Sequence, residues 1–197
     1  MRLLVFTDVH GDERIIKRLK KKAKKTDLVL CAGDITIFEH NMRRILQELN
    51  RIGKPLLLVH GNHEGESNLR KACKQHKNIV FLHKRFYEQE GVLIVGYGGG
   101  GFALRDKEFE RFEKRIRAKR KKDQKLVVMF HGPPYKLKVD RIMGEHAGSK
   151  SYTDFIKKQK PKIVICGHLH ENNYKHDKIG KTIILNPGPE GRIITIK

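Results

Sequence analysis

Short apolar segments rich in Val, Ile and Leu recur along the chain, and longer charged segments separate them. Each apolar run has the length and composition of a buried β-strand. Strands that alternate with helices favour an α/β fold with a largely parallel sheet, at least in the first half of the chain. The predicted strands are Leu3–Phe6, Leu28–Cys31, Leu56–Val59, Ile79–Leu82, Val92–Val95, Leu126–Phe130, Ile163–Cys166, Thr182–Leu185 and Ile193–Ile196.

Helices are expected between the early strands and again in the second half of the chain. The clearest case spans residues 39–52, whose apolar positions fall on one helix face: Met42, Ile45, Leu46 and Leu49. Further helices are expected at 13–25, 66–75, 106–123 and 149–158. A hairpin with a turn around Asp177–Gly180 is expected near the C-terminus. No repeat or linker divides the chain, so residues 1–197 are predicted to form a single domain.

Composition and the N-terminal segment exclude several classes of protein. No apolar run approaches the roughly 18 to 20 residues that span a bilayer. Only four consecutive apolar residues precede Thr7, so a secretory signal is not expected and a cytoplasmic location is. The three cysteines, Cys31, Cys73 and Cys166, include no closely spaced pair, which argues against a disulfide framework and a zinc knuckle.

Polar residues with metal-binding side chains follow five of the predicted strands. Open α/β sheets bind their ligands at the carboxyl ends of the strands. We therefore expect the functional site to be assembled there. The five strand ends read Asp8-Val9-His10, Gly33-Asp34, Gly61-Asn62-His63-Glu64, His131 and Gly167-His168-Leu169-His170.

Two metal ions would satisfy this set of side chains. Asp8 and His10 are two residues apart, so in an extended backbone their side chains would share a face and converge on one ion, and His168 and His170 repeat this spacing. Asp34 has two carboxylate oxygens and could bridge two cations. A single histidine after a strand is usually a surface residue, but the joint occurrence of all five motifs favours a metal site. Nitrogen and oxygen ligands without a thiolate suit Mn, Fe, Zn, Ni or Co.

The ordered series of motifs resembles the calcineurin-like metallophosphoesterases, over nearly the whole chain. The later segments around His131, Gly144–Ser149 and Gly167–Glu171 resemble the small, cap-less branch that contains phosphodiesterases. The resemblance implies an α/β fold in which a β-sandwich of two mixed sheets is flanked by helices, an αββα arrangement. It also implies a metal-dependent phosphoester hydrolase, for which Mn is the expected metal.

The resemblance further assigns roles to individual residues. One metal would be held by Asp8, His10, Asp34 and His170, and the other by Asp34, Asn62, His131 and His168. A hydroxide that bridges the two metals would attack phosphorus in line with the leaving group. His63 would protonate the leaving oxygen as a general acid or stabilise its charge, with Asp12 or Glu64 orienting it. Asn62, His63 and His146 would contact the substrate.

The substrate class stays open at this point. A phosphodiester is expected, because the chain is too short for a large cap, and a phosphomonoester or phosphoprotein is the alternative. The formal net charge of +21 and the basic runs Lys17–Lys25 and Lys114–Lys125, both expected on helix faces, would attract polyanions. A nucleic-acid-binding protein, or a nuclease, is thus a second class of function. No pattern specifies the oligomeric state.

A glycine-rich segment suggests a rival function. Gly96-x-Gly98-x-x-Gly101 follows a predicted strand and matches the spacing of a dinucleotide-binding fingerprint. That fingerprint requires a helix to begin at once, whereas Phe102–Arg105 intervene here. We therefore expect a loop that borders the site instead.

Overall fold

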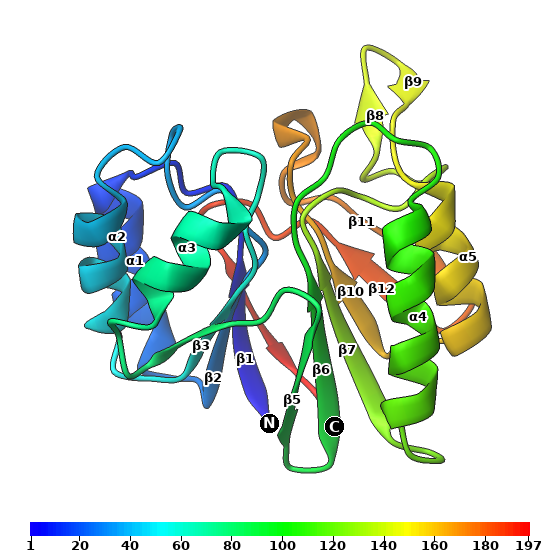
Figure 1. Ribbon diagram of the computed structural model, residues 1–197, viewed down its shortest axis with the longest axis horizontal. Helices are drawn as coiled ribbons and strands as arrows, with labels where there is room; N and C mark the ends of the chain where they lie inside the picture. Colours follow the sequence, from blue (N-terminus) through cyan, green and yellow to red (C-terminus); the bar gives the residue numbers. More distant parts are fainter.

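Two β-sheets pack face to face in the middle of the molecule, and a layer of helices covers the outer face of each sheet (Figure 1). The computed structural model describes residues 1–197. Each sheet contains both parallel and antiparallel strand pairs. The αββα fold that the sequence predicts is therefore confirmed.

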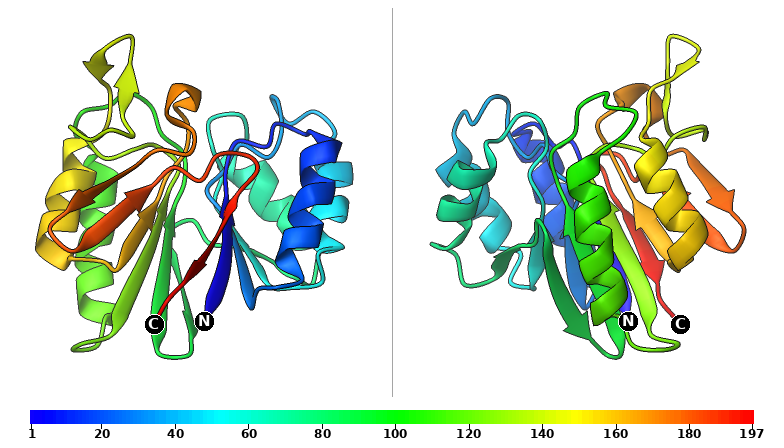
Figure 2. Two further views of the ribbon diagram at one scale, coloured as in Figure 1. Left: turned by 180° about the vertical axis from the view of Figure 1, so that it is seen from behind. Right: turned by 45° about the vertical axis from the view of Figure 1, so that its right-hand side comes forward.

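The first sheet holds the N-terminal half of the chain together with its last strand. Its elements are β1 (Arg2–Phe6), α1 (Glu13–Ala23), β2 (Leu28–Cys31), α2 (Met42–Asn50), β3 (Leu56–Leu58), α3 (Glu66–Cys73), β4 (Ile79–Phe81) and β13 (Arg192–Thr195). The strand order is β13-β1-β2-β3-β4. A helix returns the chain after each of the first three strands, so β1 to β4 are parallel. β13 pairs antiparallel with β1 and lies beside it in Figure 2.

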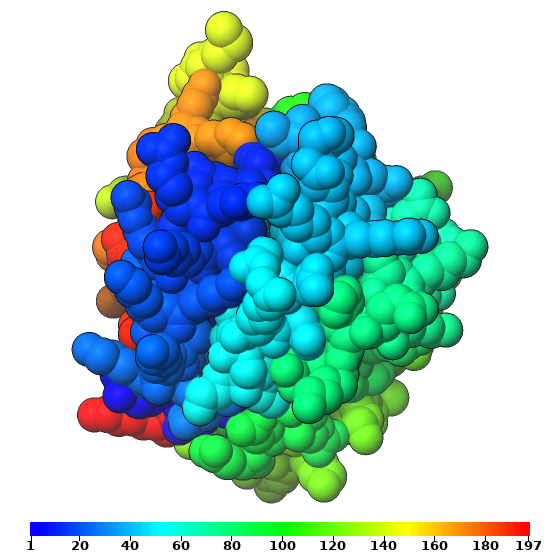
Figure 3. Space-filling model, turned by 90° about the vertical axis from the view of Figure 1, so that its left-hand side faces the viewer, coloured from blue at the N-terminus to red at the C-terminus, as the bar shows by residue number.

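The second sheet is built from the C-terminal half and has the order β11-β12-β10-β7-β6-β5. Its elements are β5 (Arg85–Gln89), β6 (Val92–Tyr97), α4 (Lys107–Lys119), β7 (Lys125–Phe130), α5 (Lys150–Gln159), β10 (Ile163–Ile165), the 3-10 turn η1 (His170–Asn172), β11 (His176–Ile179) and β12 (Thr182–Leu185). A small hairpin of β8 (Arg141–Ile142) and β9 (Glu145–His146) projects beyond the sheet at the top of Figures 1 and 3.

Three apolar layers hold these elements together. One lies between α1–α3 and the first sheet, one between the two sheets, and one between the second sheet and α4 and α5. They contain 19, 16 and 17 buried residues, so no single layer dominates the core. The inner strands are buried on both faces, which explains why they read as continuous apolar runs. No helix combines the length and the apolar character that crossing a membrane requires.

Some predicted boundaries are wrong, and the errors concern polar segments. The helix expected at 106–123 ends at Lys119, so the basic run Lys114–Lys125 lies only partly on a helix. The hairpin expected near the C-terminus is present as β11 and β12, but its turn lies at Gly180 and Lys181, because β11 extends to Ile179. β5 was not expected at all. β5 and β11 are edge strands with polar, half-exposed sequences, so they lack the apolar run that marks an inner strand.

The loops that follow β1, β2, β3, β7 and β10 gather at one edge of the two sheets, whereas both chain ends lie at the opposite edge (Figure 1). This edge receives loops from both sheets. All the motifs singled out in the sequence therefore meet there.

Candidate metal centre

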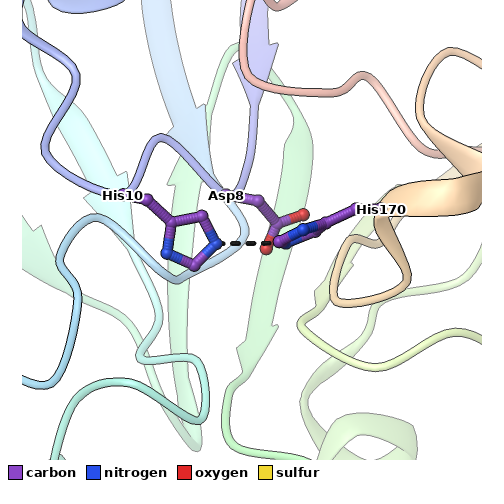
Figure 4. A group of neighbouring side chains, drawn as sticks. All are labelled: Asp8, His10 and His170. Atoms are coloured by element: carbon purple, nitrogen blue, oxygen red, sulfur yellow. Dashed lines mark hydrogen bonds between the residues drawn. The ribbon is translucent and has the colours of Figure 1, made fainter.

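The predicted ligands fall into two clusters, and each cluster draws residues from both sheets. Asp8, His10 and His170 form the first (Figure 4), and Asp34, His131 and His168 form the second. Within each cluster, the ligand atoms lie within 4.8 Å of one another. Asn62 joins the second cluster, because its Oδ1 lies 3.0 Å from His131 Nε2 and 2.8 Å from His168 Nδ1.

The spacing of Asp8 and His10 suggested an extended backbone. The structure instead has a left-handed backbone at four of the predicted ligands. Asp8, His10, Asp34 and His168 have φ angles of 53°, 47°, 51° and 70°. This left-handed region costs a non-glycine residue about 1 to 2 kcal/mol. Such strain persists where surrounding structure enforces it, and it concentrates at functional sites. The side chains therefore converge through tight left-handed turns at the strand ends.

Two glycines allow the loops to approach the carboxylates closely. A Cβ atom on Gly61 would lie 1.8 Å from Asp34 Oδ1, and one on Gly167 would lie 2.6 Å from Asp8 Oδ2. Neither position can carry a side chain without displacing a predicted ligand. This is the physical reason for glycine in these two strand-end motifs.

In the first cluster, two imidazole nitrogens and a buried carboxylate lie together. His10 Nδ1 donates to the Thr36 carbonyl at 3.0 Å, so in the neutral ring His10 Nε2 carries a lone pair. That nitrogen lies 3.0 Å from His170 Nε2 (Figure 4). The Asp8 carboxylate is buried beside them and pairs with no Lys or Arg, and burial raises its pKa.

In the second cluster, the buried Asp34 carboxylate likewise pairs with no Lys or Arg, but it faces His131. His131 Nδ1 donates to the Ala32 carbonyl at 2.8 Å, which turns Nε2 toward Asn62 Oδ1 and toward Asp34 Oδ2, 3.4 Å away. Burial opposes charge on both partners. Even so, their mutual hydrogen bond and attraction lower the pKa of Asp34 to about 2 and raise that of His131 to about 9. His168 is different, because burial lowers its pKa to about 4 and its Nε2 is buried without a partner.

These contacts fit divalent cations. Imidazole nitrogens, an amide oxygen and two buried carboxylates converge, and no Lys or Arg forms an ion pair with any of them. Cations bound at the two clusters would neutralise the buried carboxylates. The Nδ1–H bonds of His10 and His131 to backbone carbonyls fix the ring orientation, as is usual for metal-binding histidines. The donor set, all nitrogen and oxygen, suits first-row transition metals.

His63 lies at the border of both clusters. Its backbone N–H donates to Asp34 Oδ1 at 3.0 Å, and its ring centroid is 4.8 Å from that of His10. His63 Nδ1 accepts the backbone N–H of Phe38 at 3.3 Å. In the neutral ring the proton is therefore on Nε2, which is free to donate.

Neither Asp12 nor Glu64, which were expected to orient His63, forms a side-chain hydrogen bond with its ring. The Asp12 side chain caps α1 by accepting the N–H groups of Arg14 and Ile15. The buried Glu64 carboxylate accepts the backbone N–H groups of Asp34, Gly61 and Thr36, together with the Thr36 hydroxyl. It thus ties the loop after β2 to the loop after β3. Both carboxylates serve the local backbone.

His146, expected to contact the substrate, lies on β9 outside the two clusters. Its Nδ1 is 2.6 Å from Oδ1 of the buried Asp140. Asp140 also accepts three backbone N–H groups of the surrounding loop. No sequence pattern pointed to Asp140, or to the carbonyls of Ala32 and Thr36, because their roles depend on backbone geometry.

Comparison with known proteins supports these observations. An uncharacterized protein of Methanocaldococcus jannaschii is 26% identical to this chain over an alignment 205 residues long. The alignment covers 98% of this chain and 91% of the relative. A crystal structure from Thermus thermophilus superposes with a TM-score of 0.79 at 19% identity, over 95% of this chain and 88% of that one. A dimetal phosphatase from Danio rerio superposes with a TM-score of 0.68 at 10% identity, over 94% and 86%.

The two structural likenesses concern the fold, because the sequence identities are low. The family itself is shown by the sequence. The family model for calcineurin-like phosphoesterases matches residues 1–172, a stretch that contains both clusters and His63. The chain therefore belongs to the calcineurin-like phosphoesterase family.

Proposed function

We propose that this protein is a dinuclear metal-dependent phosphodiesterase. Its family consists of metal-dependent phosphoesterases, so hydrolysis of a phosphoester is the activity of the chain. The observation that carries the proposal is the convergence of four imidazole side chains and two buried carboxylates from both sheets, with no Lys or Arg to balance the carboxylates.

We infer that Asp34 serves both metals, because it groups with His10 as well as with His131 and His168. Asp8, His10 and His170 would complete one site with it, and Asn62, His131 and His168 would complete the other. When bound, the two cations neutralise the phosphate and lower the pKa of a bound water, so that a nucleophile exists at neutral pH. Mn is the metal that we expect to support turnover.

His63 would act on the leaving group through its Nε2–H. The resemblance implied either proton donation or charge stabilisation. Because Nδ1 accepts the N–H of Phe38, a proton on Nδ1 would oppose that donor. A neutral ring that donates a hydrogen bond to the developing oxyanion fits this contact better than an imidazolium acid.

The charge of the site favours diesters over monoesters. A phosphodiester carries one negative charge, whereas a phosphomonoester carries up to two at neutral pH. Dianions are commonly held by Arg or Lys in addition to metals. None of the seven proposed ligands, nor His63, forms a hydrogen bond or ion pair with a Lys or Arg side chain.

The proposal is tested by comparing two chromogenic substrates. Metal-stripped protein is assayed with bis-p-nitrophenyl phosphate and with p-nitrophenyl phosphate, with and without Mn²⁺. We expect Mn-dependent turnover with a higher kcat/KM for the diester. A higher value for the monoester would identify a phosphomonoesterase, and no turnover of either would reject phosphoester hydrolysis of this type.

A pair of histidine variants provides the control. His131→Asn removes a buried proposed ligand and should abolish turnover and reduce metal content. His176→Asn changes an exposed histidine on β11 and should leave both unchanged. If His131→Asn is as active as His176→Asn, the proposed metal centre does not take part in the reaction.

A further inference from the structure

Two phenylalanine rings are exposed beside the metal centre. Phe38 is 77% exposed and Phe102 is 61% exposed. The Phe38 ring centroid lies 4.5 Å from that of His63, and the Phe102 centroid lies 5.2 Å from that of His168. Single exposed apolar residues are common on protein surfaces. Here, however, each ring contacts a histidine of the site.

The backbone of Phe38 is strained, although its N–H donates to His63 Nδ1. Its φ is 46°, a region that is costly for a bulky side chain. Its side chain also remains in solvent, so no burial compensates for the strain. Strain combined with exposure of an aromatic ring is a feature of binding sites rather than of cores.

Phe102 follows the glycine run Gly98–Gly101, which leads from β6 to the rim of the site. The run approaches the second cluster closely, because a Cβ on Gly100 would lie 3.8 Å from His131 Cδ2. The loop thereby carries an aromatic side chain to the edge of the metal centre. The dinucleotide-type glycine spacing seen in the sequence thus belongs to this loop.

The two rings come from opposite halves of the molecule. Phe38 lies in the loop between β2 and α2 of the first sheet, and Phe102 lies in the loop between β6 and α4 of the second (Figure 1). The clusters of ligands draw on both sheets and lie where these loops meet. The apolar surface of the two rings is therefore divided by polar ligands, unlike the continuous patch that a lipid or a protein partner needs.

We propose that Phe38 and Phe102 are stacking platforms for the two organic groups of a phosphodiester, and that these groups are nucleosides. A phosphodiester extends on both sides of phosphorus, which matches a platform on each side of the centre. Nucleobases stack on exposed aromatic rings, and each such contact contributes about five- to 150-fold in affinity. The inference deepens the proposed function and rests on it.

The test compares two diesters that share a leaving group and a charge. The p-nitrophenyl ester of thymidine 5′-monophosphate carries a base, and methyl p-nitrophenyl phosphate does not. For the Mn-loaded protein we expect the nucleoside ester to have a kcat/KM at least about ten-fold higher. The ratio of the two values cancels any effect of a substitution on the chemistry at phosphorus.

Variants then assign this preference to the rings. The double variant Phe38→Ala/Phe102→Ala should bring the ratio close to one. Phe102→Trp should retain more of the preference than Phe102→Leu, because Leu is apolar but not planar. Met143→Ala removes an apolar side chain that is 93% exposed in the loop between β8 and β9, and it should keep the full ratio.

The failures of the two proposals are distinguishable. If both diesters are hydrolysed but the wild-type ratio of their kcat/KM values is near one, the stacking platforms alone are overturned. The same conclusion follows if the preference survives in the double variant. Absence of turnover rejects the proposed function. In that case calorimetric affinities of the same two diesters for the Mn-loaded protein test the platforms, and equal affinities overturn them.

Discussion

The hydrogen bond that Nδ1 makes with the backbone orients the ring of His10, His131 and His63 and determines which way Nε2 faces. His10 and His131 each donate Nδ1–H to a carbonyl, which turns Nε2 toward the other proposed ligands, whereas His63 accepts an N–H at Nδ1 and so presents a proton on Nε2. The types and positions of these residues could be predicted, because each directly follows a buried strand. Their protonation could not, since it depends on backbone groups such as the Phe38 N–H.

We predict that His63→Ala retains metal but loses turnover. Loss of one preorganised hydrogen-bond donor to a developing oxyanion typically costs about 10²- to 10³-fold in kcat. Steady-state assays with the diester and metal analysis of the same preparation check this. His40→Ala, at an exposed histidine in the loop before α2, is the control and should behave as wild type. Unchanged kcat in His63→Ala would remove His63 from the mechanism.

We predict that Glu64→Gln weakens both the fold and metal binding. The amide can accept only through one oxygen, so it leaves N–H donors of Asp34 and Gly61, or of Thr36, buried without an acceptor. We expect a loss of about 1 to 3 kcal/mol in unfolding free energy. Metal affinity should fall about 10- to 100-fold. Denaturant unfolding and metal titration measure these, and Glu88→Gln on the edge strand β5 should change neither.

At the scale of elements, the apolar runs predicted nine of the strands, and the apolar face of α2 predicted all four of its buried residues. The edge strands β5 and β11 could not be predicted, because they present no apolar run. They are specified instead by the turns that join them to β6 and β12, where Gly91 and Gly180 have φ angles of 73° and 57°. Turn chemistry and pairing with an inner neighbour replace the missing hydrophobic signal.

We predict that Asp12→Ala destabilises α1 without affecting catalysis. The carboxylate caps the helix, and loss of such a cap costs about 0.5 to 2 kcal/mol. Thermal or denaturant unfolding should show this loss, while kcat for the diester stays at the wild-type value. A fall in kcat with unchanged stability would instead support the role that the sequence suggested for Asp12, which is to orient His63.

We predict that His83, at the junction between β4 and β5, makes stability depend on pH. Burial, reinforced by nearby charged groups including Lys84 and Arg70, lowers its pKa from 6.5 to about 3, although Glu66 lies 3.5 Å away. Between these values the unfolded chain binds a proton that the native ring does not, so stability is lost as the pH falls below 6.5.

The matched variant is His83→Asn, whose amide oxygen can still accept the Gly98 N–H that His83 Nδ1 accepts at 2.8 Å. Unfolding free energies are measured for both proteins at about pH 7.5 and about pH 5, on either side of the ordinary histidine pKa. We expect the wild type to lose more stability than the variant over this interval. An equal loss would show that His83 does not titrate on unfolding.

At the scale of the whole molecule, both halves contribute to the centre, and the positive charge lies largely outside it. Exposed Lys and Arg side chains line α1. The helix lies on the face that Figure 3 turns to the viewer, and the remaining basic run surrounds the end of α4. With a formal net charge of +21, the field of the protein attracts polyanions. The sequence predicted this charge but could not show where it lies relative to the site.

We predict weak, salt-sensitive binding of single-stranded RNA and DNA. Phosphate neutralisation releases counterions, so affinity should fall steeply between about 50 and 200 mM salt. Filter binding at the two concentrations checks this. Reversing charge at Lys17, Lys21 and Lys24 should reduce binding further, while hydrolysis of a small diester stays unchanged. Absent or salt-independent binding would contradict the prediction.

The pairing of β13 with β1 has a consequence for the order of events during translation. β1 leaves the ribosome long before its antiparallel neighbour, which ends at Thr195. Until β13 has been synthesised, one side of β1 has no partner, and an unpaired strand edge invites association with other chains. Nascent copies on one polysome are therefore most prone to aggregation in this interval, and a chaperone that binds nascent chains would protect this edge.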